Sequence, residues 1–346
     1  MKRYSHPIGN NQVTLYEAIC DIENLKLAHR NARKGKGWYK EVKMVDANPD
    51  IHLLQLQDML INKTYHTSEY QTFTKTDGKK ERLIYKLPYY PDRICQWAIM
   101  QVIEPILMRQ FVRDTYSAIP KRGIHLCLKR VRKAMEDKQG TQYCLKLDVK
   151  KYYPSIKHSI LKDKYRKIFK DKNLLWLLDE IIDSTPEGEG VPIGNYLSQY
   201  SGNYFLSAFD HWIKEQMRVK YYFRYMDDIV ILHGSKEYLH FLIPKIINYL
   251  RIDGLTVKDN WQIFPTYTRG LDFVGYRIFD DFILLRKTTC LKMERKMREL
   301  AKKEVLTESD SCSIASYLGW MKYCNSYRLQ EKYIKPLKGV LDANIP

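Results

Sequence analysis

The sequence lacks the features that define several large protein classes. Its seven cysteines form no C-x-x-C pair, which argues against a zinc finger, and their odd number argues against a disulfide framework. No run of about 18 apolar residues is present, so no membrane-spanning helix is expected. The basic N-terminus is not followed by the apolar stretch of a secretory signal. No repeat occurs, which argues against a solenoid. We therefore expect a cytoplasmic protein with no membrane partner.

Acidic residues are scarce relative to basic ones. The 346-residue chain has 58 Lys and Arg against 40 Asp and Glu, a formal net charge of +18. Such a charge favours a polyanionic partner, either nucleic acid or an anionic membrane surface. Aromatic residues make up 13%, and 27 residues are tyrosines, which suit stacking on bases or, equally, an aromatic core. No Lys-rich amphipathic terminal helix is evident, so nucleic acid is the favoured partner.

One short segment repeats this charge pattern locally. Residues 33–37 (RKGKG) form a basic run that contains two glycines. Such a run suits a solvated loop and, with equal weight, a loop that contacts the backbone of a nucleic acid.

The hydrophobic pattern predicts an α+β fold with a mostly antiparallel sheet. Strands are expected over 141–149 and over 221–233, the latter bent at a tight turn. Hairpins are expected over 68–87, turning at Asp77-Gly78, and over 271–286, turning at Asp280-Asp281. Helical patterns cover residues 13–31, 92–110, 124–138, 158–184, 196–219, 236–251 and the chain from about 290 onward.

Three aspartates carry the main chemical signal. Asp148 lies on the face of its predicted strand opposite the apolar side chains, and Asp227 and Asp228 lie at the turn of 221–233. An adjacent Asp pair in an apolar hairpin is costly near a core unless a cation offsets it. Mg²⁺ prefers such carboxylate oxygens, and two ions about 3.5–4 Å apart stabilise both oxygens of a phosphoryl transfer. For the dipeptide alone, two turn-forming aspartates are the simpler interpretation.

Five blocks in order over residues 60–285 resemble those of reverse transcriptases. Residues 225–228 (YMDD) resemble the Y-x-D-D box, and residues 147–156 (LDVKKYYPSI) resemble the first catalytic block. Residues 193–199 (IGNYLSQ) stand where the family has Q-G-x-x-x-S-P. Residues 92–98 with Arg122-Gly123 resemble the fingers motifs, and residues 271–276 (LDFVGY) resemble the primer-grip hairpin.

The resemblance implies a right-hand polymerase that copies RNA into DNA. Its expected parts are an N-terminal helical extension (1–60), fingers (61–140 with part of 158–200), a palm with an antiparallel sheet and helices on one face (141–285), and a helical thumb (286–346). The implied cofactors are two Mg²⁺ ions, with Mn²⁺ as a substitute. The implied partners are template RNA, a cDNA or DNA primer, and dNTPs.

The resemblance also implies roles for single residues. Asp148, Asp227 and Asp228 would be the catalytic metal ligands, and Tyr153 matches the aromatic gate that selects deoxynucleotides. Lys75 and Arg82 match the fingers pair that holds the triphosphate, with Lys79 and Lys80 as alternatives for the lysine. Ile193 and Gly194 would line the nucleotide site. The expected template and primer contacts are Arg122, Gln199, Tyr225, Met226 and Gly275.

Two departures from the family pattern point to a branch. Ile193 replaces the usual Gln, and Gln199 replaces the usual Pro. This block resembles diversity-generating retroelement enzymes, a group II intron-like bacterial and phage branch. These enzymes copy a template-repeat RNA with errors at adenine during mutagenic retrohoming, together with a small basic, oligomeric accessory protein. The alternatives are a retron or defence-associated reverse transcriptase and, more remotely, an inactive RNA-binding protein on a polymerase scaffold.

Overall fold

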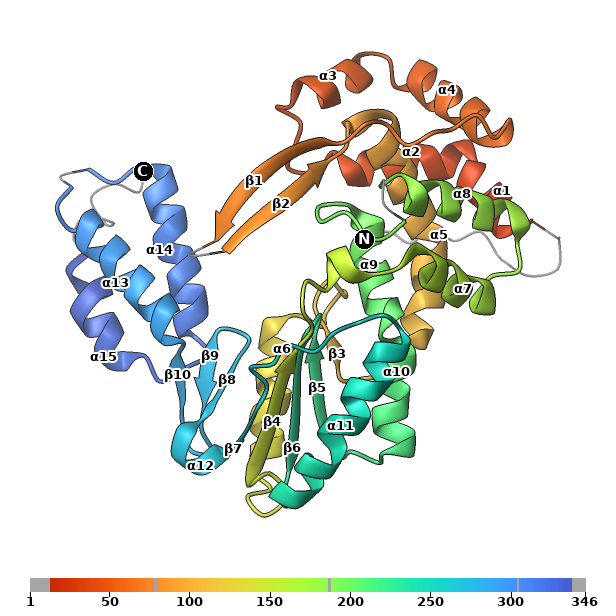
Figure 1. Cartoon of the computed structure of the whole chain (residues 1–346). Coiled ribbons are helices and arrows are strands. Elements are labelled where there is room, and N and C mark those ends of the chain that lie inside the picture. The colour runs from red at the N-terminus through yellow and green to blue at the C-terminus, as the bar shows by residue number, and fades with distance from the viewer. Residues whose placement is uncertain (1–12, 78–79, 186–187, 304, 338–346) are drawn as a thin grey trace. The chain divides into compact units, whose positions relative to one another are not determined.

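The computed structural model describes residues 13–77, 80–185, 188–303 and 305–337 (Figure 1). The chain forms two compact units. The first comprises Met1–Ala118, Val149–Arg218 and Lys245–Lys258, and the second comprises Ile119–Asp148, Val219–Pro244 and Asp259–Pro346. None of the helices formed by the described residues has both the length and the apolar character needed to cross a bilayer.

The first unit begins with a group of helices. They are α1 (Leu15–Cys20), α2 (Ile22–Ala32), α3 (Lys40–Ala47) and α4 (Pro49–Ile61). The prediction of one helix over 13–31 is wrong, because Asp21 has an extended backbone (φ −58°, ψ 129°) between α1 and α2. The Asp21 side chain accepts a hydrogen bond from the Glu23 N–H, so this residue ends one helix and caps the next.

The predicted hairpin over 68–87 is confirmed. Strands β1 (Gln71–Asp77) and β2 (Lys80–Lys86) pair antiparallel, and Gly78 and Lys79 of the expected turn lie outside the described residues. The chain continues through η1 (Tyr89–Arg93), α5 (Ile94–Gln110) and the short strand β3 (Thr115–Tyr116). Helix α2 packs against α5.

The two long helices expected over 158–184 and 196–219 are each interrupted. After η2 (Tyr153–Ser155), the structure has α7 (His158–Ile168), α8 (Lys172–Asp183), α9 (Tyr196–Phe205), α10 (Ser207–His211) and η3 (Trp212–Gln216). Phe169 is extended (φ −109°, ψ 135°), and the Asp171 side chain accepts hydrogen bonds from the Asn173 and Leu174 N–H groups. A capping carboxylate therefore starts a new helix here.

The second unit contains the main antiparallel sheet. The strands of this sheet that belong to the second unit are β4 (Tyr143–Asp148), β5 (Tyr221–Tyr225), β6 (Asp228–His233) and β7 (Gln262–Pro265), in the order β5-β6-β4-β7. Leu145 and Leu147 are buried while Lys146 is partly exposed, as the alternation in the sequence predicted. Helix α6 (Ile124–Met135) packs beside β5, and α11 (Lys236–Ile252) follows β6 and continues into the first unit. The mixed helix-and-sheet class is confirmed.

Residues 271–286 form a three-stranded sheet instead of the expected single hairpin. After α12 (Thr266–Arg269), strands β8 (Leu271–Phe273), β9 (Tyr276–Ile278) and β10 (Ile283–Leu285) pair in the order β10-β9-β8. Val274 (φ 44°) and Gly275 (φ 89°) form an additional two-residue turn with both residues left-handed, the geometry that matches strand twist. The helical C-terminal region is confirmed by α13 (Lys287–Leu300), α14 (Glu308–Met321), α15 (Tyr327–Leu329) and η4 (Gln330–Ile334).

Candidate active site

Strand register brings two of the predicted catalytic aspartates side by side. Asp148 ends β4 and Asp228 begins β6, and their Cα atoms are direct partners in the antiparallel pair. Directly opposed residues project from the same face of a sheet. The sequence placed both members of the Asp pair in the turn, but only Asp227 lies there, because Asp228 is already paired in the strand. The β4–β6 pair thus presents two carboxylates together, with that of Asp227 adjacent in the turn.

A buried arginine supports the turn that carries Asp227. Arg224 in β5 has no exposed surface, and its Nη1 donates a hydrogen bond of 2.9 Å to the Met226 carbonyl. Met226 has a φ of 59°, a left-handed conformation that is uncommon for a side chain of this size. A buried charge is costly unless it is hydrogen-bonded, so Arg224 and this turn stabilise each other. Arg224 was not among the predicted site residues, although a lone cation in an aromatic strand (YYFRY) was the available signal.

The carboxylate pair lies in a poorly solvated setting. Asp228 has a side chain that is 28% exposed, and its Oδ1 is buried with no hydrogen-bond partner. Burial raises the pKa of Asp228 to about 6, and the neighbouring Asp148 and Asp227 raise it as well, while Lys146 opposes them. This pKa means that positive charge near Asp228 would strongly favour its ionised form.

The donor chemistry of this site fits a divalent cation. Across the described residues, no three His, Cys, Asp or Glu side chains are already arranged to hold a metal ion. Even so, Oδ1 of Asp228 is buried without a hydrogen-bond partner, and Asp148 supplies a second carboxylate beside it. Hard carboxylate oxygens of this kind are the ligands that Mg²⁺ takes. That Asp148, Asp227 and Asp228 hold the metals stays a prediction.

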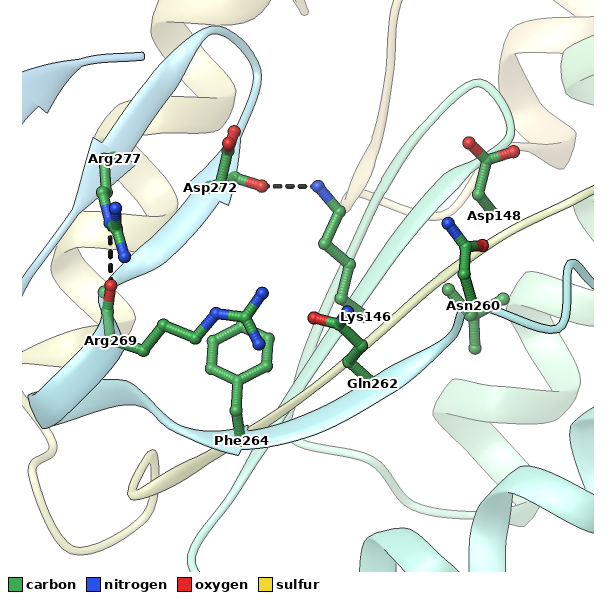
Figure 2. Close-up of a pocket in the computed structure, with 10 residues that line it drawn as sticks. Lys146, Asp148, Asn260, Gln262, Phe264, Arg269, Asp272 and Arg277 are labelled. Carbon is green, nitrogen blue, oxygen red and sulfur yellow. Dashed lines mark hydrogen bonds between the residues drawn. The ribbon is translucent and has the colours of Figure 1, made fainter. Parts of the chain in front are cut away.

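Lys146 connects the carboxylates to strand β8. Its Nζ lies 3.6 Å from Oδ2 of Asp228 and donates a hydrogen bond of 2.5 Å to the Asp272 carbonyl (Figure 2). Asp272 is held in turn by Arg286, whose Nε lies 2.6 Å from its Oδ1. Lys146 was not among the predicted site residues. Its position two residues before Asp148, and hence on the same face of β4, was the signal that could have identified it.

A cavity of about 340 Å³ opens beside Asp148, between the main sheet and the β8–β9 hairpin (Figure 2). Three cationic side chains line it, those of Lys146, Arg269 and Arg277, against two carboxylates. The Arg269 guanidinium lies 4.6 Å from the centre of the Phe264 ring, and Nε of Arg277 donates a 2.8 Å hydrogen bond to the Arg269 carbonyl. An excess of positive charge next to the predicted catalytic carboxylates suits a phosphate-bearing substrate.

The predicted primer-grip turn packs against helix α14. Gly275 has a φ of 89°, and a Cβ at this position would lie 2.4 Å from Cζ3 of Trp320. The Tyr276 hydroxyl donates a 3.0 Å hydrogen bond to the Trp320 carbonyl, and the two rings lie 5.3 Å apart. Gly275 is therefore required by both its backbone conformation and the close approach of an indole ring. Nothing in the sequence pattern singled out Trp320.

Ile193 and Gly194, predicted to line the nucleotide site, lie against the β1–β2 hairpin in the first unit. The Tyr85 N–H donates a 3.2 Å hydrogen bond to the Ile193 carbonyl. Gly194 has a φ of 124°, and a Cβ there would lie 2.9 Å from the Tyr85 carbonyl oxygen. The glycine is thus needed for close approach to strand β2. Ile193 is half-buried.

Tyr153, the predicted sugar gate, is half-buried in η2 and packs against helix α9. A Cβ on Gly202 would lie 3.3 Å from Cε1 of Tyr153, so the missing side chain makes room for the ring. Gln199 lies on the same helix and is exposed. Gly202 was not predicted, and a glycine inside a helical pattern was the only signal.

The remaining predicted residues are placed as follows. Lys75 and Arg82 are Cα partners across the β1–β2 hairpin, and Lys75 is exposed. Arg122 is half-buried immediately before α6, with its N–H bonded to the Ile119 carbonyl at 3.0 Å. The first unit contains Lys75, Arg82, Tyr153, Ile193, Gly194 and Gln199, and the second contains Arg122, Asp148, Tyr225, Met226, Asp227, Asp228 and Gly275.

Comparison with known proteins gives a consistent result. Residues 73–278, more than half of the chain, match the family model described as reverse transcriptase (RNA-dependent DNA polymerase). Protein YkfC of Escherichia coli strain K12 is 26% identical over 264 residues, which cover 72% of this chain and 63% of YkfC. The chain therefore spans less than two thirds of that curated relative.

Solved structures share the fold. The apo telomerase of Candida tropicalis has a TM-score of 0.51 at 13% identity, covering 69% of this chain and 50% of the telomerase. A form of that telomerase truncated from its C-terminal domain has a TM-score of 0.49 at 14% identity, covering 67% of this chain and 59% of that one. The likeness to the apo telomerase confirms the right-hand polymerase fold. Since the family match spans both the YMDD turn and the strand that carries Asp148, the chain belongs to the reverse transcriptase (RNA-dependent DNA polymerase) family.

Proposed function

We propose that the chain is an error-prone RNA-directed DNA polymerase that copies a template-repeat RNA into cDNA. The observation that carries the polymerase activity is the register of Asp148 opposite Asp228, with Asp227 adjacent in the turn. Family membership supports the reaction type. The diversity-generating retroelement branch, with its bacterial or phage origin and mutagenic retrohoming, is supported by Ile193 and Gln199 in the block between the catalytic motifs.

The chain's own residues would prepare the site for nucleotidyl transfer. Asp148, Asp227 and Asp228 would hold two Mg²⁺ ions, with Mn²⁺ as a substitute, and bound ions of this kind stabilise charge on attacking and leaving oxygens. Lys146 partly offsets the charge of Asp228 and fixes the spacing between β4 and β8 through the Asp272 carbonyl. Arg224 holds the Asp227 turn in its left-handed conformation.

Substrate selection would fall to residues of the first unit. Lys75 and Arg82, opposite each other on the hairpin, would bind the triphosphate through fixed positive charge. Tyr153, seated against Gly202, would exclude a 2′-hydroxyl by contact with the sugar. Ile193 and Gly194 would border the nucleotide.

The proposed partners follow the same assignment. Template RNA and a cDNA or DNA primer would contact Arg122, Gln199, Tyr225, Met226 and Gly275. A small basic, oligomeric accessory protein would act with the enzyme.

We assign the N-terminal extension to 1–60, the fingers to 61–140 with part of 158–200, the palm to 141–285 and the thumb to 286–346.

Primer extension on an RNA template tests the proposal. Wild type should extend the primer with dNTPs and Mg²⁺, and Asp227→Ala should abolish extension while leaving circular dichroism unchanged. Asp281→Ala is a matched control, because Asp281 is also a turn aspartate and its side chain is 75% exposed. Substantial Mg²⁺-dependent synthesis by Asp227→Ala would contradict the site.

Sequencing the products tests the branch separately. Misincorporation should concentrate opposite template adenine. When each dNTP is withheld in turn, synthesis should stall least in the absence of dTTP, the nucleotide that pairs with template adenine. Efficient synthesis with an even error spectrum would leave the polymerase assignment intact and overturn the diversity-generating assignment in favour of a retron or defence-associated enzyme. Inactivity of the wild type with intact RNA binding would favour the RNA-binding scaffold.

A further inference from the structure

The loop between α2 and α3, residues 33–39, presents an aromatic pair to solvent. Trp38 is 71% exposed and Tyr39 is 39% exposed. Their ring centres lie 4.1 Å apart with an interplanar angle of 72°, so the edge of one ring meets the face of the other. Every nucleobase offers a π-face that stacks on an exposed ring of this kind.

The backbone of loop 33–39 is fixed by its own hydrogen bonds. The Lys36 N–H bonds to the Arg33 carbonyl at 2.9 Å, and the Tyr39 N–H bonds to the Lys36 carbonyl at 2.9 Å. Gly35 has a φ of 68°, which suits glycine and closes the first of these two turns. Trp38 is therefore held on a preformed turn, so little ordering is needed before a ligand binds.

Positive charge surrounds the aromatic pair. From Arg30 to Lys43 the sequence contains six Lys and Arg residues and a single carboxylate, Glu41. One of these cations, Arg33, is neutralised by Asp46 at 2.6 Å. Burial lowers the pKa of Lys36, and the nearby Arg93 lowers it further. Two cations held this close together would gain from a bound anion.

Loop 33–39 is attached to the hairpin that carries Lys75. Glu41, in the first turn of α3, accepts a 2.7 Å hydrogen bond from the Tyr89 N–H and lies 3.4 Å from Nζ of Lys86, the last residue of β2. Both contacts lie within the first unit. The aromatic and cationic surface therefore starts at the base of the hairpin to which we assign triphosphate binding.

We propose that loop 33–39 is a binding site for single-stranded RNA, with one base stacked on Trp38 and phosphates held by the lysines beside it. Aromatic rings interleaved with cations are the shared feature of surfaces that bind single strands without sequence preference. The local excess of cations favours a polyanion over a protein partner at this loop. The inference deepens the proposed function, since the strand would be template RNA approaching the hairpin.

Binding of a fluorescein-labelled oligouridine, followed by anisotropy without dNTPs, tests the site on the full chain. Trp38→Ala should weaken binding about tenfold, equivalent to about 1.4 kcal/mol, and Trp38→Phe should retain most of the affinity. Phe241→Ala is the matched control, because Phe241 is an exposed aromatic residue (56%) on α11 and should bind as wild type does.

The salt dependence tests the lysines. Lys40→Gln combined with Lys43→Gln should reduce the slope of log K against log salt by about 0.7 for each phosphate that the variant no longer neutralises. Wild-type affinity and slope in Trp38→Ala and in the double Lys variant would overturn the proposal. If wild type is found to be a dimer and Trp38→Ala a monomer, with RNA affinity unchanged, the loop would be assigned to contact between copies of the chain instead.

The outcome is separable from that of the proposed function. On a pre-annealed template–primer, Trp38→Ala should still synthesise DNA but should need a higher template–primer concentration to reach its half-maximal rate, since the loop contains none of the proposed catalytic carboxylates. Asp227→Ala should show the reverse, with normal oligouridine binding and no synthesis. RNA binding that depends on Trp38, in a wild-type chain that synthesises no DNA, would support this binding site and contradict the proposed polymerase activity.

Discussion

Replacing Gly275 by alanine should destabilise the contact between the β8–β9 turn and helix α14. The added Cβ would lie 2.4 Å from Cζ3 and 2.7 Å from Cη2 of Trp320, distances that real Cβ contacts do not show. The neighbouring atoms belong to a rigid ring, which cannot give way as a flexible chain would. Either the turn or the indole must move.

The expected magnitude has two parts. A left-handed conformation costs a residue with a Cβ about 1–2 kcal/mol, and Gly275 has a φ of 89°. Overpacking against the ring adds about 1–3 kcal/mol. Gly275→Ala should therefore cost about 2–5 kcal/mol, and only the backbone part should remain when Trp320 is also alanine.

Thermal unfolding of a double-mutant cycle measures both parts. Gly275→Ala should lower Tm by several degrees, and in the Trp320→Ala background the same change should lower it by less. Gly319→Ala is the matched control: Gly319 is the neighbouring residue in α14, and a Cβ there meets nothing within 4 Å. It should leave stability unchanged or raise it by about 0.5–1 kcal/mol, because alanine is the better helix former.

Two results would refute the reasoning. An equal cost of Gly275→Ala with and without the Trp320 ring would show that the clash contributes nothing. Stability of Gly275→Ala equal to that of Gly319→Ala would show that neither the conformation nor the contact matters. Because the turn is proposed to contact the primer, Gly275→Ala should also shorten the products of primer extension at temperatures where the protein remains folded.

Three further predictions concern the proposed catalytic residues. Burial raises the pKa of Asp228 to about 6, so between about pH 4 and 6 the native state binds a proton that the unfolded chain does not. The free energy of unfolding in metal-free buffer should therefore fall as pH rises through this window. Asp228→Asn should flatten the pH profile of urea unfolding there, and an unchanged profile would contradict the burial argument. Tyr153→Ala should increase ribonucleotide incorporation relative to dNTPs in single-nucleotide extension, and unchanged discrimination would place the sugar gate elsewhere. Ile193→Gln should raise fidelity opposite template adenine more than opposite other bases, since the amide restores a donor and an acceptor; an identical error spectrum in sequenced cDNA would remove Ile193 from the mechanism.

Local patterns in the sequence predicted the centre of the site well. The alternation of Leu145, Lys146 and Leu147 identified β4, because a strand with one buried face repeats every two residues. The turn at Met226 and Asp227 was correctly predicted between two strands, although Asp228 already belongs to β6. The pattern did not predict the helix interruptions at Asp21 and Asp171. An aspartate is compatible with a helix interior, and only its side-chain hydrogen bonds show that it starts a new helix.

Contacts between distant segments could not be predicted from the pattern. Lys146 bonds to a carbonyl 126 residues away, and the Tyr276 hydroxyl bonds to a carbonyl 44 residues away. Lys146 and Arg224 carry charge, but their immediate sequence neighbours are apolar or aromatic and suggest packing. Their roles depend on which backbone carbonyl lies within reach, and that is set by the tertiary fold.

The register between β4 and β6 limits how this chain can change in length. A shift of one residue in either strand would move every side chain to the opposite face and separate Asp148 from Asp228. Substitutions leave the hydrogen-bonded ladder in place, whereas a single insertion or deletion inside it does not. Length variation among relatives, and the sites chosen for inserting a tag or a fused domain, should therefore fall in the connections outside residues 143–148 and 228–233.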